Sequence, residues 1–234
     1  MQYAWLIWSL TFLIAWLFVY LSLKSREGKK EMLIVSFWTS LFGLTEPIFV
    51  PEYWNPPSLF DLAQRTGFDI ESVIFCFAIG GLAVVIYEAL FRPRHQAMTE
   101  MEKRMPRHRY HAWALISAPV IFITLYLTTN LNPIYSVSIA LISGGLATWY
   151  CRPDLKTKMI VGAFIFLVLY FAYFLTLIAM NPGYVEAVWN LSALSGVLVL
   201  GVPLEELLFA LGVGFLWSSV YEHAMGQKLR HGKA

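Results

Sequence analysis

The sequence predicts an all-α integral membrane protein with seven transmembrane helices, arranged as two parallel three-helix repeats joined by a linker helix (3+1+3). Three observations support this. Of 234 residues, 58% are hydrophobic and 14% are charged, whereas about a quarter of the residues in a soluble domain are charged. Apolar runs of about 17 to 25 residues recur along the chain, the length that spans a bilayer as a helix. Finally, two segments 134 positions apart resemble one another.

The apolar runs place the helices at roughly 3–23, 32–49, 68–91, 112–129, 134–150, 159–180 and 202–222. The first run has neither a basic start nor a small-residue cleavage site, which favours a transmembrane helix over a signal peptide. Residues 58–65 are expected to form a short interfacial helix. Cys76 lies inside an apolar run and Cys151 at a helix end, so both are expected to pack rather than to form a disulfide.

Basic residues set the predicted orientation. Sixteen of the 17 lysines and arginines lie in the first, third and fifth connections and in the tail, and Arg65 is the exception. The positive-inside rule then places the N-terminus outside and the C-terminus in the cytoplasm. We expect a multi-pass protein of the plasma membrane of a bacterium or archaeon. Its expected partners are membrane lipids and, in a homo-oligomer, further copies of the same chain. Binding to nucleic acid is not expected. All five histidines lie on the cytoplasmic side, so no metal site is expected in the spans.

An internal repeat divides the chain. Segment 67–88 aligns with 201–222 with seven of 22 positions identical, and a shift of 135 just upstream pairs Trp54 with Trp189 and Asn55 with Asn190. The chain therefore divides into a first repeat (1–91), a basic loop with the linker helix (92–130) and a second repeat with the tail (131–234). A single linker helix between two three-helix units makes the repeats parallel, and sites in such proteins typically lie between repeats.

Carboxylates mark the candidate site. Glu205 and Glu206 open the last helix after Pro203, and acidic groups among membrane-grade apolar residues are usually functional. Solvated acids at a helix start would be the structural alternative. Glu71 is the repeat counterpart of Glu205, and Glu46 ends the second helix. Buried carboxyl groups can hold a proton and act as general acids. Helical spacing predicts two stripes that face one another or a shared cavity, namely Glu205, Phe209 and Leu216, and Glu71, Phe75 and Leu82.

The run Pro-Leu-Glu-Glu-Leu-Leu-Phe at 203–209 resembles the Pro-x-Glu-Glu motif of the CarR-type lycopene cyclases. These small membrane cyclases occur as two three-helix proteins or as one fused chain, and this chain resembles the fused form. The resemblance implies a lycopene cyclase of the intramolecular lyase or isomerase class. It would close the end of a linear carotenoid or other isoprenoid from the bilayer into a ring, without net redox change and without a cofactor. Some relatives act on longer carotenoids.

The resemblance also implies residue roles. Glu205 and Glu206 match the motif, whereas Glu71 enters only through the repeat, because 68–72 lacks the proline and the second glutamate. Glu205 or Glu206 would donate the proton, with Glu71 or Glu46 as partner or base. Aromatic faces would stabilise the carbocation. The candidate substrate-binding residues are Phe75, Phe209, Leu82, Leu216, Trp217, Trp54, Trp189, Asn55 and Asn190.

Parallel repeats would place both glutamate positions near the outer face. We therefore expect one composite site, from which the substrate is released and turned for a second ring. Two other functions remain open. SWEET-type sugar transporters share the 3+1+3 plan with the N-terminus outside. A carotenoid- or prenyl-lipid-binding protein without catalysis would also fit the sequence.

Overall fold

The computed structural model describes residues 3–230. The structure is mostly helical, at 76%. Within this part, six helical segments are long and apolar enough to cross a membrane. They correspond to six of the seven predicted runs. These segments contain α1 (Ala4–Ser22), α4 (Ile70–Phe91), α6 (His111–Thr128), α7 (Pro133–Cys151), α8 (Lys156–Met180), and α10 (Leu204–Trp217) followed by α11 (Val220–Met225).

The helix predicted at 32–49 begins earlier and changes geometry. It consists of α2 (Arg26–Ser40), capped by the Ser25 hydroxyl, followed without a break by the 3-10 helix η1 (Leu41–Ile48). The charged first turns of α2 explain why this element is less apolar than the other six. Pro47 lies inside η1; proline cannot donate the backbone hydrogen bond of a regular helix, which accounts for the altered geometry.

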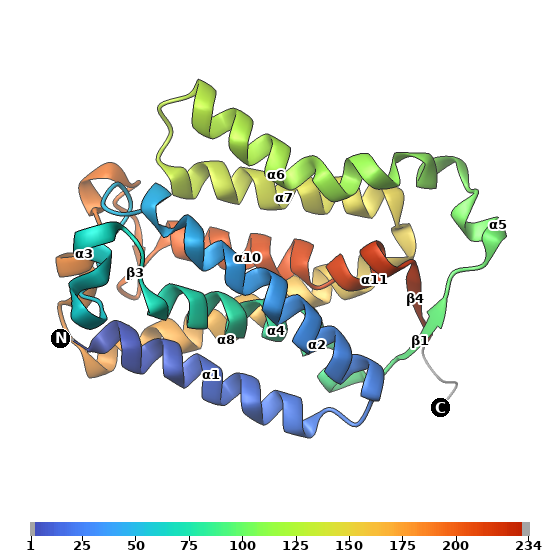
Figure 1. The fold of residues 1–234 in the computed structure, drawn as a ribbon, viewed down its shortest axis with the longest axis horizontal. Coiled ribbons are helices and arrows are strands. Elements are labelled where there is room, and N and C mark those ends of the chain that lie inside the picture. Colours follow the sequence, from blue (N-terminus) through green and yellow to red (C-terminus); the bar gives the residue numbers. More distant parts are fainter. Residues whose placement is uncertain (1–2, 231–234) are drawn as a thin grey trace.

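The helices run antiparallel to their chain neighbours, and α1, α4, α7 and α10 all start at the same end of the bundle (Figure 1). Segments 49–69 and 181–203 gather there, and we call this the loop end. It contains the helix expected at 58–65, as η2 (Leu59–Asp61) and α3 (Leu62–Thr66). The other short elements there are α9 (Tyr184–Val188), η5 (Leu191–Ala193), β2 (Leu198–Val199) and β3 (Val202–Pro203).

Segments 92–110 and 226–230 lie at the opposite end, which we call the basic end (Figure 1). The strands β1 (Arg94–Ala97) and β4 (Gln227–Arg230) pair antiparallel there, and Arg94 lies opposite Arg230. The remaining elements are α5 (Glu100–Lys103), η3 (Pro106–Tyr110) and η4 (Pro153–Leu155). Helix α6 packs mainly against α7 and η3, so much of its apolar surface faces outward.

The packing repeats as the sequence does. Helix α4 contacts both α1 and α2, and α10 correspondingly contacts both α7 and α8. At the loop end the two halves exchange equivalent hydrogen bonds. The Asn55 backbone N–H donates to the Val188 carbonyl (2.8 Å), and that of Asn190 donates to the Tyr53 carbonyl (2.9 Å). Both pairs are related by the same shift of 135, as are Trp54 and Trp189, which form a β-bridge. Such reciprocity is expected of two units related by an approximate two-fold axis.

A buried charge cluster joins the halves near the basic end. The Lys158 ammonium lies 2.7 Å from Glu88 and Glu222, which are repeat counterparts, and 3.2 Å from Glu31. His95 Nε2 lies 3.2 to 3.3 Å from the same three carboxylates. Each of these side chains is at least 95% buried. Two cations among three carboxylates offset most of the charge that burial would otherwise make costly.

This cluster predicts a pH dependence of stability. Burial alone lowers the pKa of His95, but hydrogen bonds to Glu222, Glu31 and Glu88 outweigh it and raise the pKa from 6.5 to about 12. The folded protein thus keeps a proton that the unfolded chain releases above about pH 6.5. The stabilisation is complete below that pH and is lost as the pH rises toward 12. The Tm should therefore fall between about pH 6.5 and pH 9, and fall less steeply in His95→Gln. Parallel profiles in thermal unfolding would contradict this assignment.

Candidate active site

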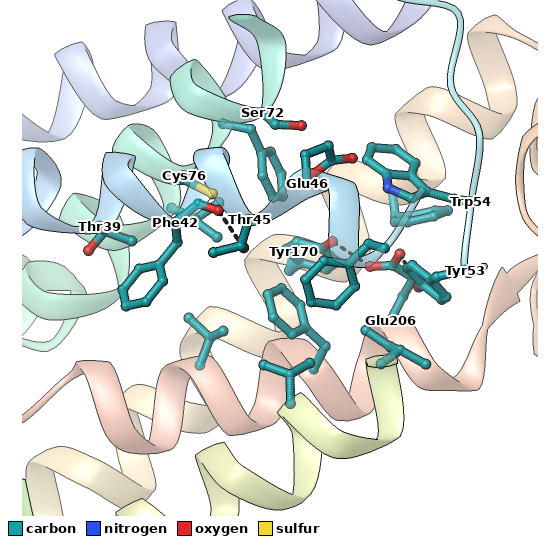
Figure 2. Close-up of a pocket in the computed structure, with 18 of the residues that line it drawn as sticks. Thr39, Phe42, Thr45, Glu46, Tyr53, Trp54, Ser72, Cys76, Tyr170 and Glu206 are labelled. Carbon is teal, nitrogen blue, oxygen red and sulfur yellow. Dashed lines mark hydrogen bonds between the residues drawn. The ribbon is translucent and has the colours of Figure 1, made fainter. Parts of the chain in front are cut away.

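An apolar cavity of about 180 Å³ lies between the two repeats near the loop end. Thirteen of its 24 lining residues are aromatic, so most of its wall presents ring faces or edges. Figure 2 shows that Glu46 and Glu206 reach it from different helices. The aromatic lining residues are Trp5, Trp8, Phe42, Phe49, Tyr53, Trp54, Phe75, Tyr170, Tyr173, Phe174, Trp189, Phe209 and Trp217.

Glu206 lies in the first turn of α10 and is surrounded by donors. It accepts hydrogen bonds from the Tyr53 hydroxyl, the Tyr170 hydroxyl (2.5 Å) and the Trp189 indole N–H (2.9 Å). Burial and the neighbouring Glu206 raise the pKa of Tyr53, so its hydroxyl keeps the proton that it donates. Three donors converging on one carboxyl group favour its ionised form. The cavity therefore presents a buried carboxyl group that three donors hold in place.

Glu46 ends the second helix of the first repeat and has a different environment. Its side chain is buried and lines the same cavity. In the described structure, its Oε1 atom is buried without a hydrogen-bond partner. A neutral carboxyl group costs far less to bury without partners than a charged one. The two carboxyl groups of the cavity thus differ in their hydrogen bonding: Glu206 is held by three donors, whereas Glu46 has a buried oxygen without a partner in the described structure.

Glu205 and Glu71 do not line the cavity. Glu205 accepts hydrogen bonds from the Tyr135 hydroxyl (2.6 Å) and the Ser195 backbone N–H (2.8 Å), and Glu71 accepts one from the Leu59 backbone N–H (2.7 Å). Each carboxylate thus holds the loop that precedes its own helix. The prediction that these glutamates face a shared cavity is wrong, because loop N–H groups that lack other partners draw them aside.

The rest of each predicted stripe divides in the same way. Phe75 and Phe209 do line the shared cavity. Leu82 is fully buried away from it, and Leu216 borders a second cavity. The positions that follow the two glutamates, Ser72 and Glu206, are repeat counterparts, and both line the shared cavity. The side of each helix that faces the cavity is therefore rotated from the predicted stripe, so that it includes Ser72 or Glu206 in place of the preceding glutamate and retains the phenylalanine.

Among the other candidates, Trp54, Trp189 and Trp217 line the cavity, whereas Asn55 and Asn190 do not. The asparagines instead link the two segments of the loop end through their backbone N–H groups. In addition, the Asn190 side-chain amide donates to the Glu52 carbonyl (3.2 Å).

Sequence reasoning missed Tyr53 and Tyr170. Tyr53 precedes a repeat-matched tryptophan, which was an available signal, whereas Tyr170 lies in an apolar run that gives no hint of its contact with Glu206.

A second apolar cavity of about 380 Å³ adjoins the first between α2, α6 and the α10–α11 segment. The two cavities share Thr39, Phe42 and Trp217. At this junction the Trp217 indole N–H donates to the Thr39 hydroxyl (2.8 Å). Phe42 is half exposed and lies at the edge of the bundle. The two cavities therefore meet at three shared residues, between the carboxyl groups and the edge of the bundle.

Comparison with known protein families finds a match in the second half of the chain. Residues 132–224 match the family model described as lycopene cyclase. This segment begins just before α7 and ends within α11, and it contains both Glu205 and Glu206 but not Glu46 or Tyr53. No curated protein and no solved structure is significantly similar to the chain. The Glu206 carboxyl group of the cavity thus lies within the segment that matches the lycopene cyclase family model.

Proposed function

We propose that this protein is a membrane-embedded carotenoid cyclase that closes the end group of a linear polyene into an ionone-type ring by acid-initiated, redox-neutral chemistry. The observation that carries the proposal is the pairing of Glu46 and Glu206. Glu46, which has one buried oxygen without a partner in the described structure, and Glu206, which is held by three donors, share a single aromatic-lined cavity. The family match of the second repeat supports the same role.

The size of the cavity limits what reacts there. An engineered cavity of about 150 Å³ holds one benzene molecule, and this cavity measures about 180 Å³. It therefore accommodates one ring-sized end group and not a whole polyene. Each binding event would close a single ring, and the substrate must leave and turn before its second end reacts.

The residues divide the chemistry between them. Protonated Glu46 donates its proton to the terminal double bond, which leaves a carbocation. A double bond further along the polyene attacks this cation and closes the ring. The Glu206 carboxylate and the aromatic faces stabilise the positive charge, since such interactions are strong in a dry site. A proton then leaves the ring to the Glu46 carboxylate. One proton enters and one leaves, so no oxidant or reductant is needed.

The second cavity provides a route for the rest of the polyene. With an end group beside Glu206, the chain would pass Thr39 and Trp217 into the space between α2 and α6. Leu115→Trp, which fills the second cavity, should therefore lower kcat/KM by about 10- to 100-fold, a loss expected from displacing a bound substrate. Ile116→Trp is the matched control, because Ile116 lies next to it on α6 but is exposed and does not line the cavity. Equal activity of the two variants in vesicles containing lycopene would exclude this route.

The same proposal fixes the arrangement in the membrane. The element formed by α2 and η1 would be the seventh span, and the two three-helix repeats would be parallel about an axis along the bundle. The reciprocal bonds of Asn55 and Asn190 support such a relation. The loop end would face outward and the basic end the cytoplasm, in the plasma membrane of a bacterium or archaeon. The substrate would enter from the surrounding lipid.

The proposal is tested by incubating the purified protein with lycopene in lipid vesicles and separating the pigments by chromatography. We expect ring-ended products of unchanged mass. Folded protein that binds lycopene and returns it unchanged would show a binding protein instead of a cyclase. Products that have gained or lost two hydrogens would rule out redox-neutral chemistry.

A further inference from the structure

Three histidines and one cysteine lie close together at the basic end, at the opposite end of the bundle from Glu46 and Glu206. They come from separate segments: His108 from η3, His111 from the start of α6, Cys151 from the end of α7 and His223 from α11. One ligand atom each of His108, His111 and Cys151 lies within 4.8 Å of the others. The rings of His111 and His223 are 4.7 Å apart. The histidines therefore meet in a way that their positions in the sequence did not predict.

Several donor atoms in this cluster lack partners. In the described structure, His111 Nδ1 and His223 Nε2 are buried without a hydrogen bond. The His223 side chain is 1% exposed and Cys151 is 4% exposed. Buried polar atoms are nearly always bonded, and an unbonded one often indicates a missing ion or water. Here the unbonded atoms are one nitrogen from each of two imidazole rings that meet edge to face.

The surroundings complete a ligand set. Cys151 Sγ lies 3.8 Å from His108 Nδ1, close to the separation of two ligands around one tetrahedral ion. His223 Nδ1 lies 3.3 Å from the Thr148 hydroxyl, which leaves Nε2 as the free nitrogen of a ring that contacts His111. A metal-binding histidine is usually oriented by a hydrogen bond from its second ring nitrogen to a carboxylate, a backbone carbonyl or water, and on His223 the Thr148 hydroxyl occupies this position. The nearby Arg152 guanidinium is bound to Asp154 at 2.7 and 2.9 Å, which offsets its charge.

The donor types select the metal. Imidazole and thiolate donors without a carboxylate suit Zn²⁺ and similar ions, and not Mg²⁺ or Ca²⁺, which prefer oxygen. The acidic cluster of Glu31, Glu88, Glu222 and His95 also brings donor atoms together. There, however, the Lys158 ammonium already contacts all three carboxylates. At the histidine–cysteine cluster, by contrast, the neighbouring Arg152 is paired with Asp154.

We propose that His108, His111 and Cys151, with His223 as fourth donor, bind a divalent ion of the zinc class. The ion would tie η3 and the start of α6 to the end of α7 and to α11. Since α6 packs mainly against α7, this bond would fasten the linker helix to the second repeat. The site is structural and lies apart from the cavity that contains Glu46 and Glu206, although His223 and Thr148 also border the second cavity.

Cobalt(II) provides the test, because thiolate-bound tetrahedral cobalt has an intense near-ultraviolet charge-transfer band and strong visible bands. Metal-free protein, purified without a histidine tag, should bind one cobalt ion per chain with both signatures, and Zn²⁺ should displace it. Cys151→Ser should abolish the charge-transfer band. His108→Gln and His111→Gln should each weaken binding at least about 10-fold, as loss of even an outer contact does. Cys76→Ser is the matched control and should leave the spectrum unchanged.

Thermal unfolding gives an independent readout. Zn²⁺ should raise the Tm of the wild type and of Cys76→Ser, but not that of Cys151→Ser, because an ion stabilises only the form that binds it. Absence of the cobalt bands in folded wild type, or their persistence in Cys151→Ser, would overturn the proposal. An equal response of the Tm of all three proteins to Zn²⁺ would do the same.

Discussion

Replacing Glu206 with glutamine should lower the rate of ring formation by about 100- to 1000-fold, the effect of removing one preorganised electrostatic contact in a dry site. The amide has the same shape: its oxygen can accept hydrogen bonds from Tyr53 and Trp189, and its NH2 group can donate to the Tyr170 hydroxyl once that hydroxyl turns, so the protein should still fold. It carries no charge, however, and so cannot oppose the carbocation. The measurement is the initial rate of product formation in vesicles containing lycopene.

Glu205→Gln is the matched control, because the two glutamates are adjacent in the sequence but only Glu206 lines the cavity. Glu205 holds the loop through Ser195 and Tyr135, so its replacement should lower the Tm and leave most of the activity. The reverse result, an inactive Glu205→Gln and an active Glu206→Gln, would move the chemistry to the loop.

Glu46→Gln should reduce kcat by about 100- to 10,000-fold, the range that general acid catalysis contributes. Glutamine resembles a neutral carboxyl group in size and polarity but has no proton that it can transfer to an alkene. Substrate binding, and therefore KM, should change little. Rates over a range of lycopene concentrations separate the two parameters.

Glu52→Gln is the control for this variant, because Glu52 is exposed in the loop that follows Glu46 and does not line the cavity. Wild-type kcat in Glu46→Gln would assign the proton donor elsewhere. A rise in KM without a fall in kcat would make Glu46 a residue that binds the substrate instead.

The sequence predicted the elements whose cause is local or periodic. Apolar length located the helices, since an 18- to 25-residue apolar run has few alternatives. The repeat correctly paired Trp54 with Trp189, which meet in a β-bridge. It also correctly placed Phe75 and Phe209 at one cavity. These successes rest on side-chain periodicity and on the copying of one unit.

The sequence did not predict which glutamates line the cavity and which hold a loop. Neighbouring side chains on a helix point about 100° apart, so Glu205 and Glu206 had to face different surroundings. Which of them met the cavity depended on Tyr53 and Tyr170, from distant segments, and on loop N–H groups that had no other partner. Only the tertiary structure brings these donors together.

The histidine–cysteine cluster was missed for a related reason. Metal motifs are recognised in a sequence by short spacings between ligands. Here only His108 and His111 are close in the chain, whereas Cys151 and His223 come from other helices. Their meeting depends on how α6, α7 and α11 pack, which no local pattern encodes.

The claim that a cavity acid starts a redox-neutral cyclisation is tested most directly by isotope transfer. The protein, equilibrated in D2O and present in excess over lycopene, is allowed a single turnover, and the products are examined by mass spectrometry. We expect one deuterium for each ring formed, carried by the carbon that was protonated, and no label in Glu46→Gln because no ring forms. Ring-ended product without deuterium would contradict the account.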